Sequence, residues 1–277
     1  MDIIGMANLF LYKTYKLPDQ VFHHEVKQLK EISELKHNFI KEENISQLPG
    51  VVGKYLHNCG FAGAPLSDVT EVLWTDTKIK LSPNKKWMPL DTYQYNFSSA
   101  CARLAYMHAR MAGFIPFEGR DKYHNGSGHM YGKLAKMITV FDNYSNEVAL
   151  GGAVILLAEA LLEPTIALQN YITWESINDY SAKGTLHNKN IKVSGSFYFN
   201  DKGEYIRFES DDRPFEVAKG KYETKAFSIT LGEYSVTNGF WLPGKVFATW
   251  HLEGGDFTYW EGEITGLRRN IHHAADT

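Results

Sequence analysis

The chain has 277 residues, of which 44% are hydrophobic and 22% charged, as in globular proteins with one large domain or two small ones. The net charge of −3 and the lack of a long basic run argue against nucleic acid as a partner. Cys59 and Cys101 are the two cysteines and lie far apart in the sequence, so we expect buried free thiols and no disulfide framework.

Residues 1–45 are predicted to form an N-terminal helical segment. Apolar residues recur every three or four positions between Asp19 and Phe39, which indicates an amphipathic helix. The preceding stretch, residues 1–16, is too short to span a bilayer and lacks the charge pattern of a secretory signal. We therefore expect a soluble, cytoplasmic protein. Membrane association remains an alternative, through Ile3, Ile4, Leu9 and Phe10.

The remaining elements indicate one α+β domain over residues 46–268, followed by a tail at 269–277. A short helix is predicted between Pro49 and Gly60. Alternating patterns over residues 69–143 and again from Ile191 onward predict antiparallel strands with short turns. Residues 148–162 are apolar nearly all round, which predicts a buried helix ended by Pro164. The predicted architecture is a large curved antiparallel sheet, a half-barrel, with a buried central helix, N-terminal helices and all helices on one face.

The stretch RDKYHNGSGHMYGK, residues 120–133, predicts a two-residue hairpin centred on Asn125 and Gly126. In that register Lys122 lies opposite His129 and Asp121 lies opposite Met130, and side chains alternate between the two faces. Lys122 and His129 then share a solvated face, where the lysine disfavours a metal ion. Asp121 lies among apolar residues on the other face, so it is the informative residue.

Three ionisable residues lie in apolar surroundings and are expected to find partners. Arg103 shares a strand face with small and apolar residues, Asp121 neighbours Met130, and Glu159 lies within the apolar helix. Because burial of a lone charge is costly, we expect Arg103 to pair with Asp121 or Glu159. The simplest role of such a pair is to fix the helix to the sheet; the functional alternative is a polar anchor at the bottom of an apolar pocket.

Arg213 and Trp174 complete the predicted ligand-binding set as polar groups of a cavity. Arg213 could instead pair with the adjacent Asp211 or Asp212, and a tryptophan such as Trp174 belongs more often to a core. The sequence contains no GxSxG, Walker A, HExxH or GxGxxG motif, so catalytic residues stay unknown and we expect no metal and no cofactor.

An ordered set of segments, including LPGVVGKYL, CARLAYMHARM, RDKYHNGSGHM and FYFNDKGEYIRFESDDRP, resembles an uncharacterised family of bacterial and archaeal proteins over residues 46–268. The resemblance implies no activity. Many family members begin with a membrane-spanning helix, which implies a membrane anchor as an alternative location. The order of elements also resembles lipoprotein-carrier half-barrels. The positions that fit the family pattern are Pro49, Tyr55, Trp87, Asp121, Gly126, Gly128, Glu159, Pro164, Trp174 and Arg213.

Three functions remain open from the sequence. The first is non-enzymatic binding of a lipid-like or other apolar small molecule inside the half-barrel, which the 14% aromatic content favours. The second is a hydrolase in which Asp121 and Glu159 act while Arg103 or Arg213 holds an anionic substrate. The third is a structural or interaction module whose interior is filled.

Overall fold

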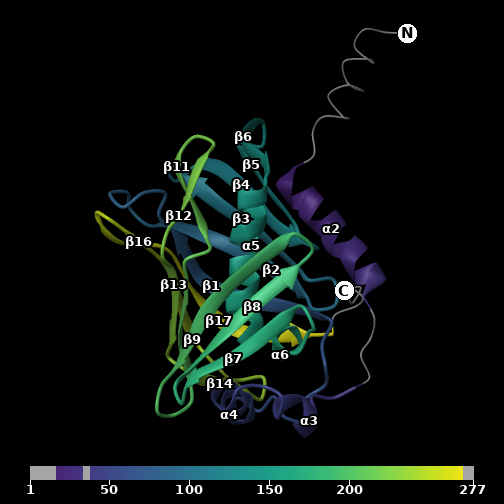
Figure 1. The fold of residues 1–277 in the computed structure, drawn as a ribbon. Coiled ribbons are helices and arrows are strands. Elements are labelled where there is room, and N and C mark those ends of the chain that lie inside the picture. Colours follow the sequence, from purple (N-terminus) through teal and green to yellow (C-terminus); the bar gives the residue numbers. More distant parts are fainter. Residues whose placement is uncertain (1–16, 34–37, 271–277) are drawn as a thin grey trace.

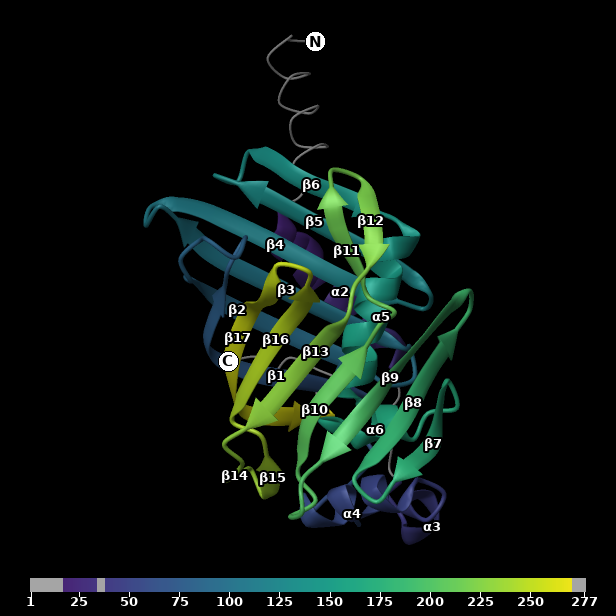
Figure 2. The same cartoon turned by 60° about the vertical axis from the view of Figure 1, so that its left-hand side comes forward.

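The computed structural model describes residues 17–33 and 38–270 of the chain. Within these residues, 13 strands form one antiparallel sheet in the order β6-β5-β4-β3-β2-β1-β17-β16-β13-β10-β9-β8-β7. The order places β1 beside the C-terminal strand, so the two strand-rich halves of the chain join through the β1–β17 ladder. The sheet stays open, with β6 and β7 as its edges, and it bends around a central helix (Figures 1 and 2). The predicted α+β half-barrel is confirmed.

The strands of the large sheet alternate between its two faces and are joined mostly by short turns. Their bounds are β1 (Val69–Ile79), β2 (Met88–Phe97), β3 (Ala102–Met111), β4 (Ile115–His124), β5 (Ser127–Leu134), β6 (Ile138–Tyr144), β7 (Ile172–Asn178), β8 (Ser181–Asn188), β9 (Ile191–Phe199), β10 (Tyr205–Ser210), β13 (Phe227–Gly232), β16 (Lys245–Leu252) and β17 (Gly255–Arg269). Two separate hairpins pair β11 (Pro214–Ala218) with β12 (Lys221–Thr224) and β14 (Ser235–Thr237) with β15 (Phe240–Leu242).

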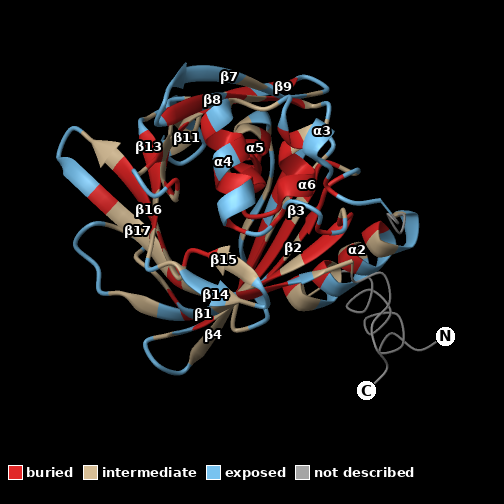
Figure 3. Cartoon of the chain, turned by 90° about the horizontal axis from the view of Figure 1, so that it is seen from below, coloured by how far each residue is buried: buried red, intermediate tan, exposed pale blue. Residues whose placement is uncertain are grey.

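The apolar stretch between β6 and β7 forms the buried helix inside the bend of the sheet. It comprises α5 (Asn146–Ala158), the 3₁₀ turn η1 (Glu159–Leu161) and α6 (Pro164–Ala167). Ser145 begins α5 by accepting a hydrogen bond from the Val148 amide, and Pro164 starts α6, where its missing N–H costs nothing. The two short helices α3 (Glu42–Ile45) and α4 (Gly50–Asn58) lie below this helical layer in Figure 1 and in front of it in Figure 3, which looks from below.

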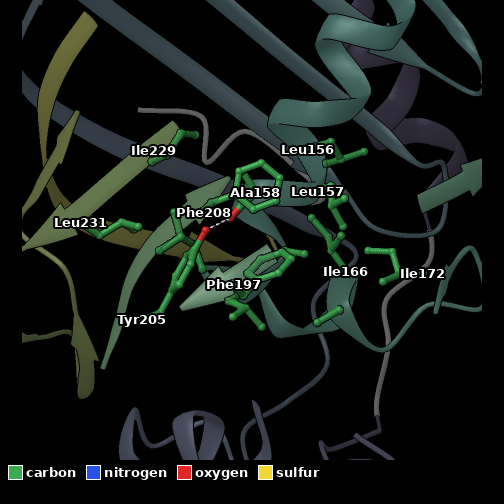
Figure 4. Packing of buried hydrophobic residues seen from close by; sticks show 14 of the residues in the cluster. Leu156, Leu157, Ala158, Ile166, Ile172, Phe197, Tyr205, Phe208, Ile229 and Leu231 are labelled. Atoms are coloured by element: carbon green, nitrogen blue, oxygen red, sulfur yellow. Dashed lines mark hydrogen bonds between the residues drawn. The ribbon is translucent and has the colours of Figure 1, made fainter. Parts of the chain in front are cut away.

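The main core lies between α5 and the strands that follow it in the chain. Phe197 and Phe208 have ring centroids 5.0 Å apart and pack toward Leu156 and Leu157 (Figure 4). Tyr205 is fully buried and donates its hydroxyl hydrogen to the Ala158 carbonyl at 3.0 Å. A buried tyrosine hydroxyl needs such a partner, and this one attaches β10 to the end of α5.

The expectation that all helices lie on one face of the sheet is wrong. Helix α2 (Pro18–Ile32) packs on the outer face of β3–β5, opposite α5, and buries Phe22, Val26 and Leu29 against residues such as Leu104. Because successive strand residues point to opposite faces, Leu104 meets α2 while Arg103 points inward. The predicted helix was also too long, since α2 ends at Ile32 instead of Phe39, although residues 34–37 lie outside the described part.

The predicted hairpin at Asn125 and Gly126 is confirmed in every pair, from His124 with Ser127 to Asp121 with Met130. Both turn residues have positive φ, 49° and 83°, as the two-residue turn requires. The predicted solvated face is wrong for His129, which is buried; Ser127 at the turn is exposed, and Lys122 and His124 are half-buried.

Polar contacts attach α2 to this outer face. Glu25 of α2 lies 3.2 Å from Arg120 Nε and 3.1 Å from Lys122 Nζ. His129 is only 8% exposed; its Nδ1 accepts from Arg120 and its Nε2 donates to Asp142 at 2.8 Å. Helix α2 therefore covers polar side chains of the hairpin, and its carboxylate pairs with two of them. Without the helix these side chains would be exposed to water.

Two further sequence expectations concern the cysteines and the N-terminus. Cys59 and Cys101 are both buried free thiols, as predicted, and burial raises the pKa of each to about 12.

In the described residues, none of the helices combines the length and apolar character needed to cross a bilayer. The residues nominated for membrane contact, Ile3, Ile4, Leu9 and Phe10, lie outside the described residues.

Gly128 tests the close approach of α5 to β5. A Cβ added there would lie 2.2 Å from the backbone nitrogen of Ala149, and backbone cannot move aside as a side chain can. We expect Gly128→Ala to lower the free energy of unfolding, measured in urea, by about 1–3 kcal/mol. Gly151→Ala is the matched control, because nothing lies within 4 Å of its added Cβ and alanine favours a helix. Equal effects of the two changes would contradict the close packing.

His129 predicts a pH dependence of stability. Burial lowers its pKa, the hydrogen bond to Asp142 opposes this, and the Arg120 charge lowers it further. Below about pH 6.5 the unfolded chain then takes up a proton that the folded state does not, so the free energy of unfolding falls as pH falls. Urea unfolding between about pH 7.5 and 5 should show a shallower decline for His129→Gln than for the unmodified chain. Parallel curves would rule out His129 as a cause.

Candidate functional site

One cation joins two carboxylates on the inner face of the sheet. Arg103 of β3 places its Nε 3.1 Å from both carboxylate oxygens of Glu159, and its Nη1 3.3 Å from Oδ2 of Asp121 on β4. The exposed fractions of the three side chains are 12%, 9% and 23% in the order Arg103, Glu159 and Asp121. Arg103 thus pairs with both acids that the sequence offered as partners.

Strand register explains why the acids meet this arginine. Ala105 lies opposite Asp121 in the β3–β4 ladder, so Arg103, two residues earlier, points from the same face. Glu159 follows directly after α5 and belongs to η1, which brings its carboxylate down onto that face. The end of the buried helix is therefore attached to β3, and through Arg103 to β4.

Two amides, which the sequence analysis missed, complete the contacts of Glu159. Gln94 Nε2 donates to Oε2 at 2.8 Å, and Asn96 Nδ2 donates to the same oxygen at 3.1 Å. The side-chain oxygen of Gln94 accepts from Arg103 Nη2 and from the Trp74 indole, both at 3.1 Å. The signal was present in β2, where Thr92, Gln94 and Asn96 alternate with larger aromatic residues and so share one buried polar face.

The charges in this network do not balance. Arg103 contributes one positive charge, whereas Asp121 and Glu159 are two acids. Burial by itself would lower the pKa of Arg103, but the charges of Glu159 and Asp121 raise it above its usual value. The arginine thus stays charged and binds both carboxylates tightly.

A cavity of about 190 Å³ adjoins the network, between the sheet strands and the end of α5. Arg103, Asp121, Glu159 and Arg213 all line it, so four of the five predicted site residues meet there. Its other walls are mostly apolar and come from both halves of the sheet. They are Trp74, Ile79, Thr92, Gln94, Ala105, Met107, Met130, Ile155, Ala158, Leu162, Ile229, Leu231, Val246, Ala248, Tyr259 and Trp260.

Arg213, between β10 and β11, approaches the cavity from the opposite side and sits among aromatic rings. Its guanidinium carbon lies 4.2 Å from the ring centre of Phe227 and 4.6 Å from that of Trp250. Its Nη1 donates to the Tyr259 hydroxyl at 2.9 Å. Within residues 17–33 and 38–270 no carboxylate pairs with Arg213; Asp212 instead accepts from Ser194. The neighbouring-acid alternative is therefore wrong.

Trp174 does not line this cavity. Its ring lies 4.9 Å from that of Phe197, and its indole nitrogen donates to the Ala167 carbonyl at 2.9 Å. These contacts place it against the main core, where it connects β7 to α6. A tryptophan in a strand gives the same sequence pattern whether it packs in the core or lines a cavity. The two roles differ only in what the strand face that carries the tryptophan packs against.

The two acids differ in what they could do chemically. Glu159 accepts from Arg103, Gln94 and Asn96, which occupies it as an anchor. Among the described residues Asp121 pairs with Arg103 alone, and it is the more exposed of the two acids. Among the residues that the structure describes, no group of three or more His, Cys, Asp or Glu side chains is arranged to hold a metal ion.

Removal of Arg103 should destabilise the chain strongly. Arg103→Met leaves two carboxylates in a poorly solvated site without their cation, which costs about 3–5 kcal/mol of the free energy of unfolding. Arg268→Met is the matched control, because Arg268 forms an exposed pair with Glu71 and should change stability little. Urea unfolding measures both. If the two variants lost similar stability, Arg103 would not hold the helix to the sheet.

The chain shows similarity to a protein family and to a solved structure. A search of curated proteins found no match. Among solved structures, a LolA superfamily protein from Nitrosomonas europaea is similar over 76% of this chain and 90% of its own, with 8% sequence identity and a TM-score of 0.39. Residues 38–262 match a family described as "Family of unknown function (DUF6544)". The chain therefore belongs to this family, whose function is not established.

Proposed function

We propose that the chain binds a lipid-like or other apolar small molecule in the cavity and releases it chemically unchanged. The observation that carries the proposal is a cavity of about 190 Å³ with largely apolar walls, inside the bend of the sheet. Protein interiors are normally packed as densely as organic crystals, so a space of this size between core elements is a feature that ligand binding would explain. Apolar walls with a few converging polar groups are typical of small-molecule sites.

The size of the space limits the ligand. A dry apolar cavity of about 150 Å³ is large enough for a benzene molecule, whereas pockets for larger ligands span about 300–1,000 Å³. The present cavity of about 190 Å³ thus fits one apolar segment, such as part of an acyl chain. Small wall residues, including Ala105, Ala158 and Ala248, leave the room that larger side chains would fill.

The charges favour a ligand with one anionic end. The guanidinium of Arg103 is already engaged by Glu159, Asp121 and Gln94. Arg213 has aromatic neighbours and a tyrosine hydroxyl but no carboxylate partner among the described residues. A carboxylate or phosphate on the ligand would supply that partner through charge-assisted hydrogen bonds. Arg213 is therefore the proposed head-group anchor, and Arg103, Asp121 and Glu159 form the polar floor.

The hydrolase alternative requires a carboxyl group that can exchange a proton with a substrate. Glu159 accepts from three side chains at once, which fits an anchor better than a general acid. The filled-core alternative leaves the cavity unexplained. The first observation favours binding over catalysis, and the second favours binding over a filled core.

A fluorescent fatty-acid probe tests the proposal directly. We expect the purified chain to bind the probe and an unlabelled fatty acid to displace it. Ala248→Leu, which extends a side chain into the cavity, should weaken binding by about tenfold, because the larger residue takes the space of a ligand segment. Ala62→Leu, at an exposed site outside the cavity, is the matched control. No saturable binding by the unmodified chain would exclude the proposal.

The anchor can be tested separately. Arg213→Met should weaken binding of a fatty acid by about tenfold or more, since a hydrogen bond to a charged group contributes about 1.5–3 kcal/mol. Binding of the corresponding fatty alcohol, which carries no charge, should change little. Equal losses for acid and alcohol would show that Arg213 shapes the cavity without holding a head group.

A further inference from the structure

Three hairpin loops lie together at one end of the sheet. In an antiparallel meander every second turn falls at the same end, so the turns β1–β2, β3–β4 and β5–β6 share one end. The register agrees, because Leu90 near the start of β2 lies opposite Ala109 near the end of β3. The Ala135 amide also donates to the Pro116 carbonyl at 2.7 Å. Figure 2 shows the three turns on one side of the molecule. We call residues 80–87, 110–115 and 134–139 the tip loops.

Each tip loop exposes a large apolar side chain. Leu81 is 60% exposed, Phe114 is 73% exposed and Ile138 is 60% exposed. The turns at the other end of these strands differ: residues 98–101 are Ser-Ser-Ala-Cys and residues 125–126 are Asn-Gly, with no large apolar side chain. Exposed apolar groups scattered singly need no explanation, but one on each of three neighbouring hairpins is a pattern.

The tip loops are also positively charged. They contain no aspartate or glutamate, and their basic residues are Lys80, Lys85, Lys86, Arg110 and Lys136. One countercharge approaches from β4, where Glu118 pairs with Lys136 at 3.4 Å. Lys80 lies over the ring of Trp87 at 4.7 Å. The chain as a whole has a net charge of −3, so the tip loops are basic against the overall balance.

We propose that the tip loops dock onto the surface of a bilayer that contains anionic lipids. Apolar side chains on separate protruding hairpins can enter the boundary between head groups and acyl chains, and the surrounding lysines pair with lipid phosphates. A half-buried tryptophan beside a lysine suits the same boundary. A soluble anion would explain the basic residues but not the exposed Leu81, Phe114 and Ile138.

The cavity reaches toward the same end of the sheet. Ile79 lines it and directly precedes Lys80, the first residue of the tip loops. A bilayer docked there would lie close to the apolar walls, so an acyl ligand could pass between membrane and cavity with little exposure to water. This route rests on the proposed ligand binding; the docking itself does not.

Vesicle flotation tests the docking with the full chain. We expect the protein to float with vesicles of phosphatidylcholine mixed with phosphatidylglycerol, and much less with phosphatidylcholine alone. About 0.5 M salt should release it, because salt screens the lysine–phosphate attraction. The triple variant Leu81→Ser, Phe114→Ser, Ile138→Ser should bind at least about tenfold more weakly, as should Lys85→Glu with Lys86→Glu.

Matched controls separate docking from general stickiness and from misfolding. Val236→Ser with Ile177→Ser removes exposed apolar side chains elsewhere and should leave flotation unchanged. Urea unfolding must show that every variant is folded. Ala248→Leu should keep flotation although it loses the fatty-acid probe, and the tip variants should keep the probe, so the two proposals fail independently.

Three results would overturn the docking proposal. The first is no flotation with anionic vesicles at low salt. The second is flotation that the tip variants and the controls reduce equally. The third is a concentration-dependent dimer, measured by light scattering, that the tip variants abolish while flotation is absent; the tip loops would then be a contact between copies of the chain.

Discussion

The contact on which this structure depends is the engagement of Arg103 by Glu159 and Asp121. It joins the end of the only long apolar helix in the described residues to β3 and β4, and the amides of Gln94 and Asn96 extend the attachment to β2. The 13-stranded sheet is open, so no strand pairing joins its edges β6 and β7. The curvature of the sheet must therefore be stabilised by what packs inside the bend. Helix α5 fills that place, and a buried ion pair fixes its C-terminal end.

The same attachment forms one wall of the cavity. Glu159, held on β2 and β3, lines it on one side, and residues of β13, β16 and β17 line it on the other. Arg213 faces this space from the opposite wall with only aromatic and hydroxyl contacts. Arg103 is therefore fully engaged by side chains of the protein, whereas Arg213 has no carboxylate partner among the described residues. The cavity thus has a polar group free to bind a ligand at only one of its two ends.

The two faces of the β3–β5 region perform different tasks. Inward residues build the polar network and the cavity, whereas outward residues such as Leu104, Arg120 and His129 are covered by α2. Helix α2 lies against the outer face of these strands and α5 against the inner one, whereas the turns at one end of the strands expose large apolar side chains. The exposed apolar and basic side chains of the tip loops therefore belong to the turns themselves. They are not part of a sheet face that lacks a covering helix.

Local patterns determined much of this protein. Alternation over residues 69–143, the Asn125–Gly126 turn and the continuous apolar stretch before Pro164 specified strands, register and a buried helix, because these depend on neighbours along the chain. The need of Arg103 for a carboxylate followed from its apolar strand face. The tertiary structure decided which side α2 covers, that Gln94 and Asn96 join Glu159, and that Arg213 faces the cavity while Trp174 does not. These contacts join residues distant in sequence, and a single strand pattern fixes which residues share a face but not what that face meets.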